Sequence, residues 1–305
     1  MTDKEESIKS FEKEGLPALY YAADVTSIKS QKLYLRLFLA VLVLTVAAPV
    51  FIFSASAFPC VTQLFRYLAL LCLVASLLIT GKIRESQKER TWYGARAVAE
   101  SVKTSAWRYA MAAEPFVAAM QPSDVDLLFL NTLKEIIQDQ RSLSFSGDEK
   151  ADAKPQITEA MRALRLQRWD QRLTVYLRER VNDQREWYTG KAHTSEVSES
   201  MSFWLILGTQ LLSIIALGAF AVWSSVRVNV VTVFTATTAA LLAWLQVKRY
   251  QETSQSYTVT AHELGFIAEA SKHIHSEEAL STFVSDAENA MSREHTLWAA
   301  RRQSR

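Results

Sequence analysis

Histidine and glutamate residues near the C-terminus are the first candidates for chemistry in this 305-residue chain. His262-Glu263 begins like the HExxH motif of zinc proteases, in which two histidines four residues apart bind the metal from one helix face. The second histidine position holds Phe266, so one ligand is missing. His273 and His275 are two residues apart and point to different faces of a helix. We therefore expect no metal site, no cofactor, no catalytic residue and no enzymatic activity.

A run of arginines is the second candidate, because closely spaced guanidinium groups bind anionic lipids or nucleotides. Its members are Arg162, Arg165, Arg168, Arg172, Arg178, Arg180 and Arg185. Acidic residues are interleaved with them, namely Asp170, Glu179, Asp183 and Glu186. This mixture favours the alternative interpretation, in which the arginines belong to a helix with ordinary ion pairs. No nucleic acid is expected as a partner.

The elements that hold these residues are helices, four of which are predicted to cross a membrane. Twenty-nine uncharged residues separate Arg36 from Arg66, which is too many for one crossing, and Pro49 and Pro59 favour a turn among them. Crossing a hydrocarbon core of about 30 Å takes about 20 apolar residues. The predicted spans are about 33–53, 62–82, 200–223 and 228–247. Their partner is a lipid bilayer.

Basic residues beside the spans predict the orientation of the hairpins. Lysines and arginines precede the first span and follow the second and the fourth, whereas loop 54–61 has none and the second loop has only Arg227. Loops rich in Lys and Arg stay on the cytoplasmic side. We therefore expect a multi-pass protein of the inner (cell) membrane with both termini in the cytoplasm.

The remaining segments read as long helices that form a cytoplasmic helical bundle, which makes the predicted fold class an all-α membrane protein. One helix is expected to run straight on from the second span to Pro115, and another from the fourth span to about His275. Ser123 and Ser276 are the expected N-caps of two returning helices. Both halves follow this plan, so an internal duplication is expected, with a first unit at 1–143, a linker at 144–156 and a second unit at 157–305.

The spans contain hydroxyl side chains but no Asp, Glu or His. Such hydroxyls either line a weakly polar pore or allow close packing between helices. The possible pore-lining residues are Thr232, Thr235, Thr238 and Ser213. Both interpretations remain open at this stage.

Residues 90–116 resemble the segment that follows the hairpin in the SLATT superfamily, whose name stands for SMODS and SLOG-associating two-TM effector domain. The matching residues are Trp92, Arg96, Glu100, Lys103, Trp107, Arg108, Tyr109, Pro115 and Phe116. The second half is similar to a different SLATT subfamily through Arg180, Gln184, Trp187 and Tyr188 before its hairpin and Glu288 after it. We expect the signature to be structural, because Trp107 lies about 37 Å beyond the membrane along a straight helix.

The resemblance implies a tandem of two SLATT units that acts as a pore-forming effector in a bacterial conflict or anti-phage defence system. Four spans are too few to enclose a pore, so this function requires a homo-oligomer. No sensor domain is visible in the sequence, so a separate sensor protein or a nucleotide messenger is the implied trigger. The alternative is a membrane-anchored helical scaffold that recruits cytoplasmic partners and conducts nothing.

Overall fold

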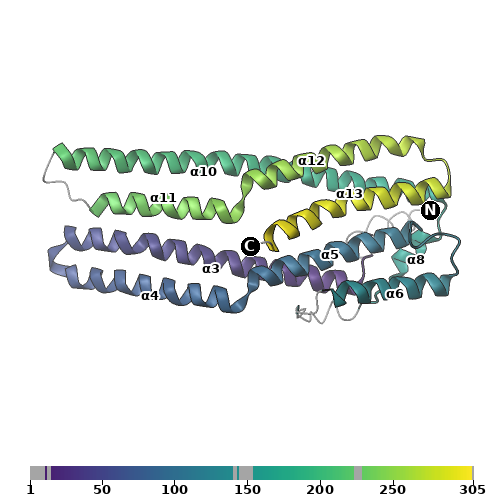
Figure 1. Cartoon of the computed structure of the whole chain (residues 1–305), viewed down its shortest axis with the longest axis horizontal. Coiled ribbons are helices and arrows are strands. Elements are labelled where there is room, and N and C mark those ends of the chain that lie inside the picture. Colours follow the sequence, from purple (N-terminus) through teal and green to yellow (C-terminus); the bar gives the residue numbers. More distant parts are fainter. Residues whose placement is uncertain (1–10, 12–14, 140–142, 144–153, 223–228, 304–305) are drawn as a thin grey trace, which may run out of the picture. The chain divides into compact units, whose positions relative to one another are not determined.

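The computed structural model describes residue 11, residues 15–139, residue 143 and residues 154–222 and 229–303, with side chains up to residue 292 apart from Asn229. These residues form helices and short connections and contain no strand (Figure 1). The predicted all-α class is therefore confirmed. The described chain divides into two compact units, and each combines segments from both halves of the sequence.

The membrane unit consists of Gln31–Lys88 and His193–Ser254. Its first hairpin is formed by α3 (Ala18–Ala57), a short 3₁₀ turn η1 (Pro59–Val61) and α4 (Thr62–Ser86). Pro49 lies inside α3, and the helix continues to Ala57, a few residues past the predicted end of the first span at about 53. The turn therefore begins at Phe58. A small apolar core of Ala48, Ala69 and Cys72 joins the two helices.

The second hairpin consists of α10 (Asp183–Val222) and α11 (Asn229–Lys248). Residues 223–228, which include the ends of both predicted spans, lie outside the described residues. The Thr209 and Thr238 hydroxyl oxygens are 2.8 Å apart and connect the two helices. Small residues and hydroxyl pairs of this kind allow helices to pack closely where the surrounding lipid gives no hydrophobic driving force.

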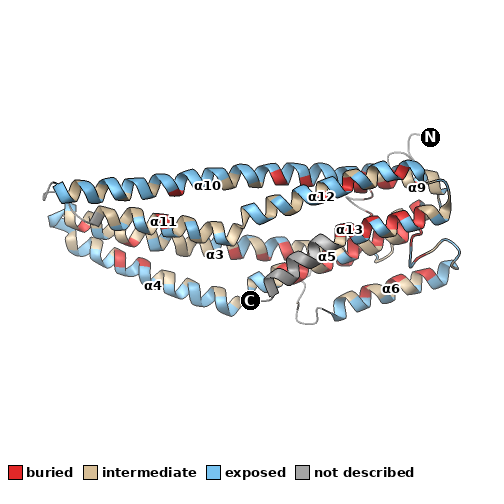
Figure 2. Cartoon of the chain, turned by 45° about the horizontal axis from the view of Figure 1, so that its top comes forward, coloured by how far each residue is buried: buried red, intermediate tan, exposed pale blue. Residues whose placement is uncertain are grey.

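Among the described residues, four helical stretches are long and apolar enough to cross a membrane, and each includes all or nearly all of one predicted span. Only 6–11% of the residues in their most apolar windows are buried within the chain. Figure 2 shows this as pale blue along α4 and α10, in contrast to the red of the bundle helix α5. A chain with so much exposed apolar helix surface is a multi-pass membrane protein.

Both emerging helices are interrupted, which corrects the expectation of straight continuations. Between α4 and α5 (Lys88–Ala110) lies Gln87, with φ of 45°. Between α11 and α12 (Tyr250–Ala270) lies Arg249, with φ of 48°. A left-handed residue ends an α-helix, and the next helix begins at once. The break occurs at the same point of both halves, which supports an internal duplication.

The bundle unit consists of Met1–Ser30, Glu89–Ala192 and Gln255–Arg305. Besides α5, α12 and the ends of α3 and α10, the bundle unit contains further helical elements. They are α6 (Pro122–Gln138), α8 (Glu159–Arg165), α9 (Trp169–Tyr176), a π-helical segment η2 (Leu177–Asn182), a 3₁₀ turn η3 (Ser271–His273) and α13 (Glu277–Gln303).

Of the two predicted N-caps, one is confirmed and one is wrong. The Ser276 hydroxyl accepts a hydrogen bond of 3.1 Å from the Ala279 N–H at the start of α13. Helix α6 begins earlier than expected, with Gln121 as its N-cap and Pro122 in its first turn. Proline is favoured there because it lacks an N–H that would otherwise be unpaired.

One hydrophobic core runs through the bundle unit and draws on both halves of the sequence. Its fully buried members include Trp107 from α5, Phe129 from α6, Tyr176 from α9 and Val284 from α13. The expected helical bundle is thus a single packed body. Of the predicted linker 144–156, residues 144–153 lie outside the described residues, and Pro155 accepts a hydrogen bond from the Ala18 N–H.

Candidate functional site

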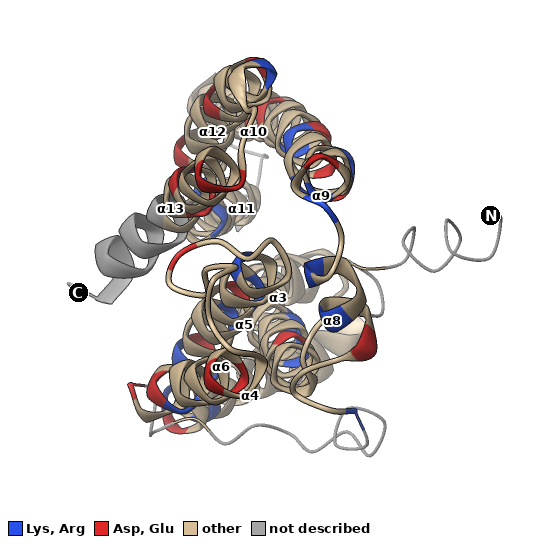
Figure 3. Ribbon diagram, turned by 90° about the vertical axis from the view of Figure 1, so that its right-hand side faces the viewer, with Lys and Arg blue, Asp and Glu red and all other residues tan. Residues whose placement is uncertain are grey.

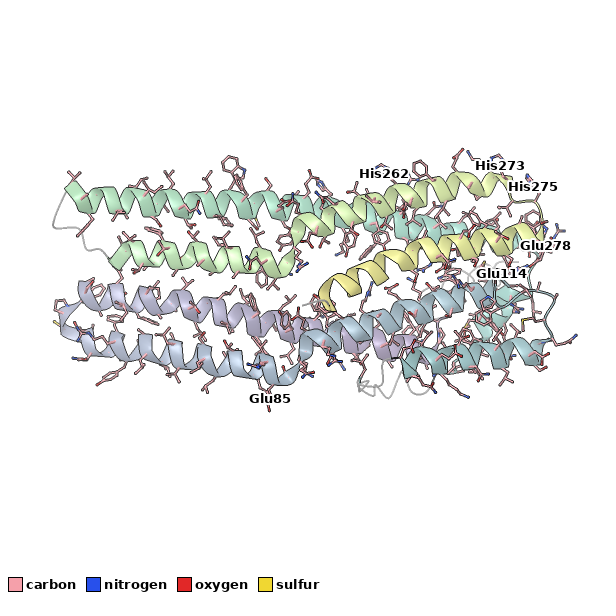
Figure 4. All side chains as sticks on the ribbon, in the orientation of Figure 1. Glu85, Glu114, His262, His273, His275 and Glu278 are labelled. Carbon is pink, nitrogen blue, oxygen red and sulfur yellow. The ribbon has the colours of Figure 1, made fainter. Side chains whose placement is uncertain are left out.

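The histidines singled out in the sequence do not gather at one place. His262 is exposed partway along α12, whereas His273 ends η3 and His275 lies in the connection after it (Figure 4). Among the residues that the structure describes, no group of three His, Cys, Asp or Glu side chains is arranged to hold a metal ion. The chemistry of the molecule must therefore be sought in its charged and aromatic bundle residues.

The first signature segment forms α5 and the turn after it. Trp107 is completely buried, with its ring 4.5 Å from the Phe11 ring and 5.5 Å from the Tyr176 ring. Its indole N–H has no hydrogen-bond partner among the described residues. Trp107 therefore contributes apolar and aromatic contact area, and it joins the N-terminal segment to α9.

The turn after α5 is held by an arginine from the basic run. Arg165 donates to the carbonyl oxygens of Tyr109 at 2.9 Å, Phe116 at 2.7 Å and Val117 at 2.9 Å. The Tyr109 carbonyl lies in the last turn of α5 and the other two follow it, in a region where helix carbonyls lose their regular partners. The Tyr109 and Val117 carbonyls also accept from the Ala112 and Met120 N–H groups. The turn contains Pro115, and Phe116 packs against Phe129 at 5.6 Å. The Arg165 guanidinium thus holds together the backbone of the turn in which the first signature ends.

Tyr109 occupies the same region and donates its hydroxyl hydrogen to Asp126. Burial raises the pKa of Tyr109 to about 12, and the Asp126 carboxylate adds to the effect through the hydrogen bond and its charge. Arg162 pairs with the other oxygen of Asp126 at 2.7 Å. Tyr109 therefore stays neutral at physiological pH and acts as a hydrogen-bond donor.

A charged cluster lies at the other end of α5. Arg96 pairs with Glu100 at 2.6 Å and with Asp24 of α3 at 3.5 Å. Burial raises the pKa of the Asp24 carboxyl, and the Arg96 charge opposes this shift. Lys103 is buried nearby on α5, and Trp92 stacks on Tyr93 at 4.4 Å. The signature residues at this end connect α5 to α3.

The second signature contributes the most deeply buried charges, which we call the Glu288 network: Thr104, Tyr176, Arg180 and Glu288. The Glu288 carboxylate is fully buried and accepts from Arg180 Nε at 2.8 Å and from the terminal Arg180 nitrogen at 2.7 Å. It also accepts from the Tyr176 hydroxyl and the Thr104 hydroxyl, both at 2.9 Å. Its four acceptor positions are thereby filled, as a buried carboxylate requires.

The Glu288 network connects the two halves of the sequence. Thr104 lies on α5, Tyr176 and Arg180 lie on α9 and η2, and Glu288 lies on α13. Burial raises the pKa of Tyr176 well above its ordinary value, and the Glu288 charge adds to this. Next to the network, Arg108 of the first signature donates to Asn289 at 2.7 Å.

The other second-signature residues lie along the beginning of α10. Tyr188 is buried and Trp187 is half-exposed, and both rings pack against Tyr257 of α12 at 5.3 and 5.4 Å. Gln184 is partly buried one turn earlier. These contacts pair α10 with α12 in the bundle unit.

The basic run is mostly committed to internal contacts. Arg172 is 2% exposed and binds Glu277 and the Met111 carbonyl, and Arg168 and Arg178 pair with neighbouring acidic residues. Blue and red residues are intermixed on α5 and α6 (Figure 3). Binding of an anionic ligand by Arg162, Arg165, Arg172 or Arg180 would have to replace these contacts.

The hydroxyl residues of the spans fall into two groups. Thr232 and Thr235 are exposed on one face of α11, together with Ala239, Leu242 and Gln246. Thr238 is buried against Thr209 of α10, and Ser213 is half-buried and donates to the Thr209 carbonyl at 3.1 Å. Thr238 therefore contributes to helix packing, and only Thr232 and Thr235 face away from the hairpin.

In the sequence, Glu288 was named only as a signature residue, and Asp24 and Thr104 were not singled out. Glu288 did carry a signal, because it lies one turn after Val284 and beside Ala287 on the apolar face of α13. A charged residue on a buried face has a partner in nearly every folded protein. The identity of that partner, Arg180, lies 108 positions away in the sequence and required the fold.

Two family models match the chain in succession. SMODS and SLOG-associating 2TM effector domain 3 matches residues 17–173, and SMODS and SLOG-associating 2TM effector domain 1 matches residues 176–298. The first match extends through the predicted linker into α9. No curated protein and no solved structure matches the chain. Two hairpins, each flanked by the aromatic and charged residues of its signature, agree with these matches, and the chain belongs to the SLATT family as a tandem of two such effector domains.

Proposed function

We propose that this protein is a pore-forming membrane effector of a bacterial conflict or anti-phage defence system and that it has no enzymatic activity. The family assignment supports the effector role, because SLATT domains are two-TM effector domains linked to such systems. In this proposal the protein lies in the inner membrane with both termini in the cytoplasm. A separate sensor protein or a nucleotide messenger triggers opening.

The observation that carries the proposal is the exposed face of α11. Thr232, Thr235, Ala239, Leu242 and Gln246 recur on it at intervals of three and four residues, so four of these five side chains are small or polar. By contrast, α4 and α10 expose bulky residues such as Leu77, Trp204 and Ile214. Bulky apolar side chains suit contact with lipid, whereas small hydroxyl and amide side chains suit a water-filled path or another helix.

The proposal requires a homo-oligomer, because four spans are too few to enclose a pore. Only 6–11% of the residues in the span windows are buried, so the spans of one chain have exposed residues that can contact lipid or further copies. Several copies that place α11 toward a common axis would surround a path lined by Thr232 and Thr235. In this arrangement α4 and α10 face the lipid.

Reconstitution of the full chain in liposomes loaded with a self-quenched dye or with potassium tests this function. We expect the proteoliposomes to release ions at high protein density, where part of the chains open without the trigger, and phage infection of bacteria that express the chain to collapse the membrane potential. Intact liposomes together with a preserved potential, at confirmed levels of protein in the membrane, would contradict the proposal. They would favour the alternative of a non-conducting scaffold, which should instead retain a stable partner in pull-downs.

A further inference from the structure

A π-helical segment lies where the bundle unit leads into the third span. Residues Leu177–Asn182 adopt it between α9 and α10, so helix runs without a break from Trp169 to Val222. A π-turn holds more residues than an α-turn, and short π-segments inside α-helices are uncommon and frequent at functional sites. The segment therefore accommodates an extra residue while both flanking helices keep their packing.

Contacts with two other helices hold the segment in this form. Glu179, Arg180 and Val181 are all buried, although three consecutive residues of an α-helix are spread over about 200° of its circumference. Arg180 donates to the Glu288 carboxylate of α13 through both its Nε and one terminal nitrogen. Tyr176, just before the segment, binds the same carboxylate, which Thr104 of α5 also holds.

The helix that follows carries any change in this segment into the membrane unit. Helix α10 is continuous over 40 residues, and from His193 onward it belongs to that unit. A change of one residue in register turns such a helix by about 100° and moves it by about 1.5 Å. In the described state Thr209 of α10 faces Thr238 of α11, with 2.8 Å between the hydroxyl oxygens.

We propose that η2 is a register switch controlled by the Arg180–Glu288 pair. When the pair separates, residues 177–182 revert to α-helix, and α10 rotates so that Gly208 takes the place of Thr209 opposite Thr238. The switch links the bundle to the third span, and its role in opening the pore rests on the function proposed above. The register itself is measurable without any conduction.

Disulfide formation between α10 and α11 measures this register. The full chain with Cys60 and Cys72 replaced by Ser receives a protease site within 223–228 and one of two cysteine pairs, T209C/T238C or G208C/T238C. After oxidation in membranes and cleavage, a disulfide keeps the two fragments together on a gel. We expect the 209–238 pair to dominate in the otherwise unchanged chain.

Glu288→Gln weakens the pair and should raise the ratio of 208–238 to 209–238 product about tenfold, as expected for the loss of a charge-assisted hydrogen bond. Deletion of Arg178 removes the extra residue, so that the segment becomes α-helical with both flanks in their original register. Combined with Glu288→Gln, the deletion should return the ratio to its starting value. Arg178→Ala, which removes the same side chain without shortening the chain, should not.

The combination separates a switch from a loss of folding. An unchanged ratio in Glu288→Gln would overturn the proposal. The proposal would also be overturned if Glu288→Gln abolished both disulfide products and the added deletion of Arg178 did not restore them. In that case Glu288 would only stabilise the fold, and removing Arg178 cannot replace that stabilisation. A shifted ratio without any change in ion release would instead contradict the proposed pore function and leave the switch in place.

Discussion

At the scale of single residues, the molecule depends on charged groups that are buried in pairs. Glu288 is fully buried and Arg180 is 2% exposed, so each satisfies the other in a region that water does not reach. Removing one partner of such a pair leaves an uncompensated buried charge, which is far more costly than the net stabilisation that the pair itself provides.

Glu288→Ala is therefore expected to lower the free energy of unfolding by about 3–5 kcal/mol. Chemical unfolding in detergent, followed by tryptophan fluorescence, measures this value. Glu278→Ala on the same helix is the matched control, because Glu278 is exposed and should change stability by less than about 0.5 kcal/mol. Equal effects of the two substitutions would show that the network contributes little.

The Asp24 carboxyl makes a separate prediction about pH. Its pKa is raised in the folded state by burial, so the folded protein binds this proton more tightly than the unfolded chain does. Stability from this group is present below the ordinary aspartate pKa and is lost as pH rises through the raised value. Asp24→Asn should remove that decline, which thermal unfolding from acidic to neutral pH measures against the exposed control Asp139→Asn. Parallel curves for Asp24→Asn and the unaltered chain would refute the assignment.

At the scale of elements, the two left-handed breaks are the feature that the halves share most closely. Gln87 and Arg249 each have φ near 45–48° between two helices. A left-handed conformation costs a residue with a Cβ roughly 1–2 kcal/mol, and glycine avoids this cost. The sequence has no glycine at either position, so the breaks could not be recognised from composition.

Gln87→Gly should accordingly leave stability unchanged or raise it by up to about 1 kcal/mol. Glu85→Gly, two residues earlier within α4, should lower it by about 1 kcal/mol, because glycine is unfavourable inside a helix. Unfolding of both variants in the same detergent compares them. A loss of stability in Gln87→Gly equal to that of Glu85→Gly would show that residue 87 is helical in the membrane.

The α11 face makes a prediction about conduction. Replacing Thr232 and Thr235 together by leucine should reduce ion release from proteoliposomes about tenfold, because an apolar constriction excludes water. Thr45→Leu on α3 replaces another exposed threonine of a span and should leave release unchanged. Undiminished release by the double variant at equal protein would remove α11 from the proposed path.

At the scale of the whole molecule, the two family domains are not two folding units. The first model ends at residue 173 and the second begins at residue 176, yet Trp107 packs on Tyr176 and Thr104 binds Glu288. The bundle core is therefore made by both domains. A cut between them divides that core.

Chains 1–174 and 175–305 expressed separately should therefore be protease-sensitive in the bundle, whereas their co-expression should restore protection. Limited proteolysis of membranes, with detection at each terminus, measures this. The intact chain cleaved at an inserted site within 144–153 is the control for a broken backbone. Protection of either half by itself would show that each domain has a sufficient core of its own.

The sequence alone determined that the chain is helical and where it crosses the membrane. Some twenty uncharged residues leave few alternatives, because in lipid every backbone group must be paired within the helix. The signature residues were also identifiable from sequence. The tertiary structure decided their roles: it moved Thr238 from a possible pore wall to a helix contact and assigned the arginine run to internal partners. Those outcomes depend on residues far apart in the chain, such as Arg180 and Glu288, whose proximity no local pattern encodes.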